Sequence, residues 1–290
     1  MGEQLFPDGL TKRLGALTIA TKSRRLGHHK GTHRSTKTGT SLDFSDFREY
    51  HPGDDLRHID WNVFARTDKP FIKQFLDEQE MRIHILLDST KSMGTDGKWD
   101  FARQLAIGFG QIALKSGDTV SFSTWTAEQN YFFRKKGALH RASFKKFVSQ
   151  LPAPSSPNGF ADHALRHVPK AVTVLFIITD GLEELSKWEL LFKRLPGICR
   201  DVRVMTIHSR TEEVPTYEGD VRFIDVEDEA IVEVSLNHRI VQQYQEKKSR
   251  HEAEIRALAN KYGIQLVRTE VTDGVMEVFT KKMRHIGWLR

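Results

Sequence analysis

Oxygen-bearing side chains alternate along the segment Asp88-Ser89-Thr90-Lys91-Ser92, which follows a short apolar run. Along an extended loop, alternate side chains such as those of Asp88, Thr90 and Ser92 can converge on one point. A second carboxylate, Asp180, follows the most apolar run of the chain. Carboxylate and hydroxyl oxygens are the ligands that hard divalent cations prefer. We therefore predict a metal site formed by Asp88, Thr90, Ser92 and Asp180, which would hold Mg²⁺ or another divalent cation.

A turn that caps the following helix is the alternative for this loop. Asp, Ser and Thr oxygens often accept hydrogen bonds from the unpaired backbone N–H groups at the start of a helix. The position of Asp180 favours the metal site, because a second carboxylate falls at the end of another apolar run. Both interpretations stay open at this point.

Short apolar runs and amphipathic stretches alternate from Met81 onward. The runs expected as strands are 82–87, 119–125, 131–134, 171–179, 202–208 and 264–267, with 221–226 as an edge strand. The helices expected are 99–113, 143–151, 184–195 and 236–262. Such alternation predicts a three-layer α/β sandwich with a mainly parallel sheet and right-handed crossovers. Ligand sites in these sheets lie at the carboxyl ends of the strands, where Asp88 and Asp180 both fall.

The beginning of the chain is basic. No acidic residue occurs between Asp8 and Asp43, whereas lysines and arginines recur from Lys12 to Lys37. We expect a short helix over about 9–21, followed by a solvated loop or arm. Such a stretch has the charge to meet nucleic acid or an anionic surface, but it lacks the interleaved aromatic side chains that stack on bases. Electrostatic nucleic-acid binding through this arm is therefore an alternative that we do not favour.

The cysteine content and the apolar runs narrow the class of protein. Cys199 is the only cysteine among the 290 residues, which excludes an intrachain disulfide and a cysteine-based metal cage. The longest strongly apolar run, 172–178, is much shorter than the roughly 20 residues that cross a bilayer. The first residues lack the basic start and apolar stretch of a signal peptide. We therefore expect a cytoplasmic protein without a membrane span.

Sequence motifs of catalysis are missing. The sequence holds neither a Gly-x-Ser-x-Gly elbow nor a phosphate-binding Gly-x-x-x-x-Gly-Lys-Ser/Thr loop. His163 and His167 have the spacing of a zinc-binding helix, but no glutamate follows His163. We therefore expect a protein that is not an enzyme. A divalent-metal-dependent hydrolase, in which Asp88 and Asp180 hold an ion that activates water, stays the alternative from another class.

A long polar block precedes the α/β region. It runs from Arg48 to Arg66 and contains the pattern Arg-x-Tyr-x-x-Gly-Asp-x-x-Arg-x-Ile-Asp-Trp. In this block the chain resembles the bacterial domain-of-unknown-function 58 family, in which this pattern precedes a von Willebrand A-like domain. The segment from Asp88 to Ser92 and the tripeptide Thr179-Asp180-Gly181 are similar to two elements of the metal-ion-dependent adhesion site of such domains. The resemblance implies a von Willebrand A-like fold for residues 81–290.

The resemblance also implies a function and a partner. Members of that family are commonly companions of MoxR-type AAA+ ATPases, which implies a non-enzymatic scaffold or adaptor through which the ATPase reaches an unknown client protein. It further implies that Asp88, Thr90, Ser92 and Asp180 are ligands of an adhesion-type metal site. Residues 1–80 would then comprise the basic arm and the signature segment, packed on the α/β core.

One position departs from the family pattern. Adhesion sites of this kind normally add a threonine hydroxyl from a loop ahead of the later strand, and Ala161 stands at that position here. We therefore expect a partly degenerate site with weakened metal affinity, weakened switching, or both. Ser155, Ser156 and Asp162 are the nearby oxygen-bearing residues that could compensate.

Overall fold

The computed structural model describes residues 5–21, 44–75, 81–156, 159–213, 219–224 and 231–290. The chain divides into two compact units, one formed by Met1–Ser23 with Met81–Arg290 and the other by Arg24–Glu80. The first residues thus group with the α/β region, whereas the sequence analysis placed them with the signature segment. Much of the basic stretch from Lys12 to Lys37 lies outside the described residues, so its role stays a prediction, as does the packing of the signature segment on the α/β core.

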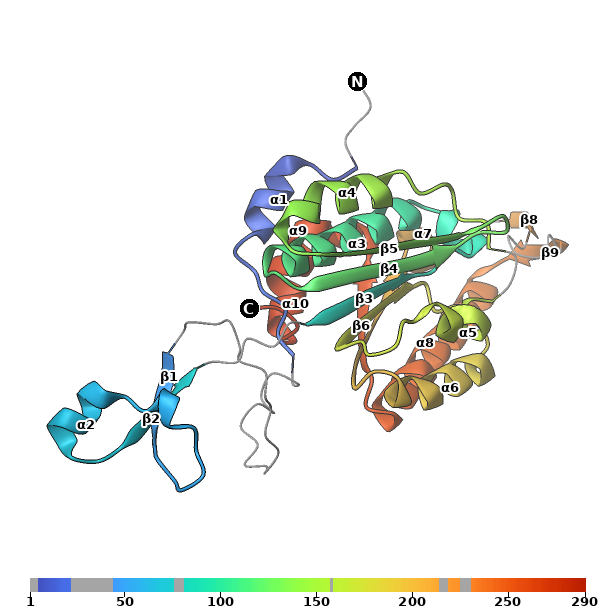
Figure 1. Cartoon of the computed structure of the whole chain (residues 1–290). Coiled ribbons are helices and arrows are strands. Elements are labelled where there is room, and N and C mark those ends of the chain that lie inside the picture. Colours follow the sequence, from blue (N-terminus) through green and yellow to red (C-terminus); the bar gives the residue numbers. More distant parts are fainter. Residues whose placement is uncertain (1–4, 22–43, 76–80, 157–158, 214–218, 225–230) are drawn as a thin grey trace. The chain divides into compact units, whose positions relative to one another are not determined.

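The larger unit is built on a six-stranded sheet with the order β10-β7-β6-β3-β4-β5 (Figure 1). Neighbouring strands are parallel except β5, which pairs antiparallel with β4 at one edge. The strands are β3 (Arg82–Leu87), β4 (Thr119–Trp125), β5 (Asn130–Lys136), β6 (Val174–Thr179), β7 (Asp201–His208) and β10 (Gln265–Glu270). Every residue of β6 is buried, as expected for a parallel strand covered on both faces.

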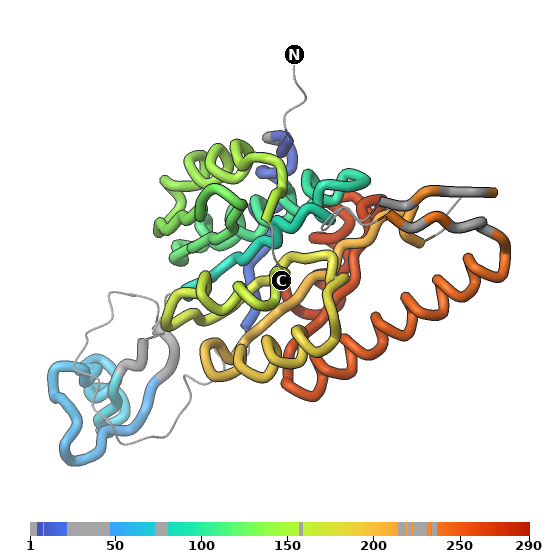
Figure 2. Tube along the Cα trace, turned by 90° about the vertical axis from the view of Figure 1, so that its right-hand side faces the viewer, coloured from blue at the N-terminus to red at the C-terminus, as the bar shows by residue number. Residues whose placement is uncertain are grey.

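Helices cover both faces of this sheet, so the predicted three-layer α/β sandwich is confirmed (Figure 1). One face carries α1 (Asp8–Leu14), α3 (Lys98–Lys115), α4 (Arg141–Ser149), α9 (Val275–Glu277) and α10 (Met283–His285). The other carries α5 (Phe160–His163), α6 (Leu185–Arg194) and α8 (His238–Lys261), the long orange helix of Figure 2. Two apolar clusters join the layers, one containing Phe109 and Phe176, the other Trp188 and Phe192.

No helix in the described ranges is long and apolar enough to cross a membrane.

The order of the strands reverses between β3 and β6. From β3 the chain builds outward through β4 and β5, then returns to β6 on the other side of β3 and continues to β7 and β10. In open α/β sheets, ligands bind at the carboxyl ends of the strands where such a reversal occurs. Asp88 follows β3 and Asp180 follows β6, so the fold places both predicted carboxylates at this point.

The beginning and the end of the chain pair with each other in the larger unit. Ile19 forms an antiparallel bridge with Leu289, and both side chains are buried. The hydroxyl of Thr21 donates to the Asp201 carboxylate at 2.8 Å, at the start of β7. The helix expected over about 9–21 is shorter than predicted, because α1 ends before Gly15 and the following segment pairs with the end of the chain.

The prediction of an edge strand at 221–226 is wrong in its placement. Those residues belong largely to β8 (Gly219–Ile224), which pairs antiparallel with β9 (Ile231–Leu236) in a separate two-stranded sheet. The edge beside β7 is occupied by β10, which pairs with β7 in parallel. The helical segment 275–285 was also missed, because α9 and α10 flank a stretch of π-helix, Val278–Lys282, which interrupts the 3.6-residue period.

The smaller unit, described over 44–75, gives part of the signature block a structural explanation. Its strands β1 (Phe44–Glu49) and β2 (Phe71–Phe75) pair antiparallel, and α2 (Trp61–Thr67) lies between them in sequence. The Arg48 guanidinium pairs with Asp54 at 2.8 Å and lowers the pKa of that carboxyl. Asp60 accepts hydrogen bonds from two backbone N–H groups in the first turn of α2 and so caps that helix. These signature residues therefore shape the local fold.

A buried histidine in the central sheet makes stability depend on pH. His84 of β3 is fully buried, and its Nδ1 lies 2.9 Å from the hydroxyl of Ser121 on β4. Burial lowers the pKa of His84 to about 3, so the folded protein holds the neutral ring. An unfolded chain takes up a proton near the ordinary value of 6.5. Because the folded pKa is the lower one, this contribution to stability is present above that value and is lost as the pH falls toward 3.

We predict that His84→Asn removes this pH dependence. Between about pH 7.5 and about pH 5, the wild type should lose roughly 2 kcal/mol more unfolding free energy than the variant, measured by urea denaturation. His285, which is exposed, offers the control His285→Asn, and this variant should keep the wild-type dependence. Equal losses in the wild type and His84→Asn would contradict the assignment.

Candidate functional site

The loop after β3 carries three of the four predicted ligand residues. It leads into a turn of 3-10 helix, Lys91–Gly94, and then into α3. The backbone N–H of Asp88 donates to the carbonyl of Ile178 at 2.9 Å, so the loop begins as a continuation of the β3–β6 pairing. Thr90 also bridges Ser156, which precedes α5 in the chain. The loop is therefore held from two sides.

Asp88 is almost fully buried and accepts three hydrogen bonds. Its Oδ1 accepts from the backbone N–H of Thr90 at 2.9 Å and from the hydroxyl of Thr90 at 2.8 Å, and its Oδ2 accepts from the hydroxyl of Thr179 at 2.7 Å. The hydroxyls of Thr90 and Ser92 lie 3.1 Å apart. The structure thus brings Asp88, Thr90 and Ser92 together. The bond from the Thr90 N–H closes a turn within the loop, but the N-cap residues of the 3-10 helix and of α3, Thr90 and Gly97, make no side-chain cap. The role of Asp88, Thr90 and Ser92 as metal ligands stays a prediction.

Asp180 lies close enough to Asp88 for their charges to interact. Burial and, after it, the Asp180 carboxylate raise the pKa of Asp88 to about 7. Asp180 itself is 4% exposed, and its Oδ1 accepts from the backbone N–H of Leu182 at 3.3 Å. Its Oδ2 pairs with the Lys98 ammonium at 3.1 Å, and the same ammonium pairs with Glu212 at 2.6 Å. A buried cation therefore lies against the second predicted carboxylate.

Lys98 and Glu212 are the residues at this site that the sequence analysis missed. Lys98 is the first residue of α3 and is 1% exposed, and Glu212 belongs to α7 (Arg210–Glu213), which follows β7. Burial lowers the pKa of the Lys98 ammonium, but the Asp180 and Glu212 carboxylates outweigh burial and leave that pKa above its ordinary value. The apolar periodicity begins at Trp99, and a lysine next to such a helix is normally expected to be exposed to solvent. The signal that could have indicated its role is its position at the start of the helix that follows the Asp88 loop.

Ala161, the departure from the family pattern, is buried beside a glutamate. Its backbone N–H donates to both carboxylate oxygens of Glu183, each at 3.2 Å. Burial raises the pKa of Glu183, against the opposing effect of these backbone donors. Asp162 pairs with Lys187 at 3.1 Å. The side chain at position 161 thus contributes a methyl group and no ligand oxygen, and the neighbouring carboxylate is already paired with a lysine.

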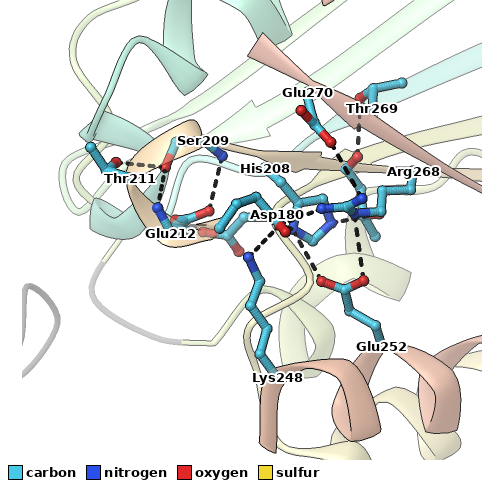
Figure 3. A network of polar contacts seen from close by, with 12 residues as sticks. Asp180, His208, Ser209, Thr211, Glu212, Lys248, Glu252, Arg268, Thr269 and Glu270 are labelled. Carbon is cyan, nitrogen blue, oxygen red and sulfur yellow. Dashed lines mark hydrogen bonds and ion pairs between the residues drawn. The ribbon is translucent and has the colours of Figure 1, made fainter. Parts of the chain in front are cut away.

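A second group of titratable side chains lies beside the end of β7 (Figure 3). His208 Nδ1 is 3.6 Å from Glu252 and 3.9 Å from Glu213, and one ligand atom from each residue falls within 4.8 Å of the others. Arg268 pairs with both glutamates, and Lys248 pairs with Glu213 at 2.5 Å. Burial and then these two cations lower the pKa of His208 to about 4, so its ring is neutral. The group has the residue types of a metal site, but its carboxylates are neutralised by cations of the protein.

The comparison with known families now decides the identity of the chain. The family described as protein of unknown function DUF58 matches residues 46–254. The chain belongs to this family. The match begins just ahead of the signature block and ends within α8, so it covers the part of the smaller unit from residue 46 onward and most of the sheet that carries Asp88 and Asp180. The resemblance drawn from Arg48 to Arg66 is confirmed.

Relatives of this DUF58 chain occur in mycobacteria. The uncharacterized proteins Mb1516 of Mycobacterium bovis and Rv1480 of Mycobacterium tuberculosis are each 24% identical over 255 residues, covering 85% of this chain and 80% of their own length. Among solved structures, the conserved hypothetical protein BatB from Bacteroides thetaiotaomicron has 13% identity and a TM-score of 0.39, covering 71% of this chain and 98% of its own. The SpRpn10 VWA domain has 12% identity and a TM-score of 0.40, covering 70% and 95%. The three-layer α/β fold class of the DUF58 chain rests on its own strand order and layers.

We predict that Thr179→Val destabilises the fold by about 1–3 kcal/mol, because it removes the donor to one oxygen of a buried carboxylate without changing the shape of the side chain. Urea denaturation at neutral pH measures this change in unfolding free energy. Thr18→Val, at an exposed position, is the matched control and should stay within about 0.5 kcal/mol of the wild type. A Thr179→Val protein as stable as the Thr18→Val protein would show that Asp88 does not depend on this hydroxyl.

Proposed function

We propose that this DUF58 protein is a non-enzymatic protein-interaction scaffold or adaptor that works in the cytoplasm with a MoxR-type AAA+ ATPase. The partner binds at the carboxyl edge of the sheet, over the loops that follow β3, β6 and β7. The ATPase would reach an unknown client protein through this adaptor. The single observation that carries the proposal is the ordered set of buried polar contacts at this edge, which holds three loops in one geometry.

These contacts favour a binding surface over a reaction centre. General acid–base catalysis requires a titratable group within hydrogen-bond reach of a substrate. Asp88 is 2% exposed, Asp180 is 4% exposed, and hydroxyl, backbone and ammonium partners from the protein already engage both carboxylates. No contact of these residues favours the metal-dependent hydrolase considered above. Groups satisfied in this way stiffen the loops around them, and a rigid surface binds a partner with a smaller loss of entropy.

An exposed apolar side chain stands at the same edge. Leu182 follows Asp180 and Gly181 directly and is 49% exposed. Apolar side chains at the centre of an interface contribute much of its binding energy when a partner covers them. Leu139 provides a contrast, because it lies at the opposite ends of the parallel strands and is 96% exposed. It follows β5, which runs antiparallel to β4 and therefore ends where β4 begins. The pair allows the edge to be tested without disturbing the buried polar contacts.

We predict that Leu182→Ser weakens binding to the purified MoxR-type ATPase of the same organism by about tenfold, whereas Leu139→Ser leaves it unchanged. Affinity is measured by surface plasmon resonance with the full chain immobilised and the ATPase held in one nucleotide state. Circular dichroism and thermal melting establish that both variants are folded. If Leu139→Ser weakened binding more than Leu182→Ser, the interface would lie at the other ends of the strands. If the ATPase bound neither the wild type nor the variants, the proposed partner would be wrong.

A further inference from the structure

The predicted metal site has a cation of its own. We propose that the Lys98 ammonium takes the place of the divalent cation at this edge, so that Asp180 is neutralised by the protein and the site does not hold Mg²⁺ or a similar ion. This inference concerns the chain alone and does not depend on which partner binds. Where the proposed function also holds, it means that a partner would be bound without a bridging metal.

Lys98 is held in position by the elements around it. Gly97 precedes it with a φ of 75°, in the left-handed region, where a glycine avoids the strain that a side chain would bring. The turn places the lysine at the start of α3, where the side chain is buried instead of extending into water. Its ammonium reaches Asp180 after β6 and Glu212 after β7, so one cation joins three loops of the carboxyl edge.

A buried ammonium is retained only where anionic partners offset its lost hydration. The two carboxylates supply those partners, at 3.1 Å for Asp180 and 2.6 Å for Glu212. A divalent ion bound to Asp180 would lie within a few ångströms of this ammonium and be repelled by it. Metal binding would therefore require Lys98 to leave Asp180, and the freed ammonium would have to find other partners or reach water from a side chain that is 1% exposed.

The other oxygen atoms predicted as metal ligands are also poorly available to an ion. Both oxygens of Asp88 accept hydrogen bonds from threonines, and the hydroxyls of Thr90 and Ser92 lie within hydrogen-bond distance of each other. Ala161 adds no oxygen where a threonine ligand is expected. The site thus has no ligand oxygen at position 161 and contains an internal positive charge. These two features act in the same direction, against a divalent cation.

The experiment compares Mn²⁺ binding by the full-length wild type and by Lys98→Met, using calorimetric titration and the electron paramagnetic resonance signal of free Mn²⁺. Methionine keeps much of the apolar stem of lysine and removes the charge. We expect the wild type to show no Asp180-dependent binding up to about 1 mM Mn²⁺, and Lys98→Met to bind at least about tenfold more tightly. The double variant Lys98→Met/Asp180→Asn should lose that gain, which assigns the ion to this edge and separates it from the His208, Glu213 and Glu252 group.

Lys115→Met, at the exposed end of α3, is the matched control and should bind Mn²⁺ as the wild type does. A wild type that binds Mn²⁺ below about 1 mM and loses this binding in Asp180→Asn would overturn the proposal. So would a folded Lys98→Met protein without a gain in affinity. If Lys98→Met does not fold, Lys98→Gln replaces it, and the wild-type titration with its Asp180→Asn partner still decides the question. Failure of the ATPase to bind would leave these titrations unaffected.

Discussion

Two carboxylates, Asp88 and Asp180, are buried at the ends of adjacent parallel strands, and the polar contacts of the surrounding loops follow from the need to keep both there. A buried carboxylate without partners is strongly unfavourable, because it loses its hydration. Thr90 and Thr179 donate to the first, and the Lys98 ammonium pairs with the second. These partners lie in separate segments of the chain. One electrostatic requirement therefore sets the geometry of the whole carboxyl edge and links it to the β3–β6 pairing below.

The strands and the position of the two carboxylates could be predicted because they depend on local patterns. Apolar runs mark β3 and β6, and the alternation with helices indicates parallel pairing, which brings Asp88 and Asp180 to the same edge. Lys98 could not be placed in this way. Its role depends on Glu212, more than a hundred residues further along the chain, and no local period relates the two. A sequence pattern gives the residue types of a site but not which long side chain turns inward.

The errors in the fold prediction have a similar origin. An alternating segment such as β8 indicates a strand but not its partner, and here the partner is β9, while β10 occupies the place beside β7. In the smaller unit, the pattern of arginines and aspartates indicated the DUF58 family, and such residues also suggest a network of ion pairs. In the structure, Arg48 and Asp54 form an ion pair, and Asp60 caps helix α2. A family signature can therefore reflect local folding as well as shared function.

The bridge between Ile19 and Leu289 has a consequence for where the chain can be shortened. Because the segment before residue 24 belongs to the α/β unit, Arg24–Glu80 interrupts the sequence of that unit instead of preceding it. Within the larger unit, Thr21 lies beside the start of β7 and Met81 directly precedes β3. Trimming the chain back to Met81 would therefore remove Phe6, which is fully buried in the core of the larger unit, and so destabilise that unit.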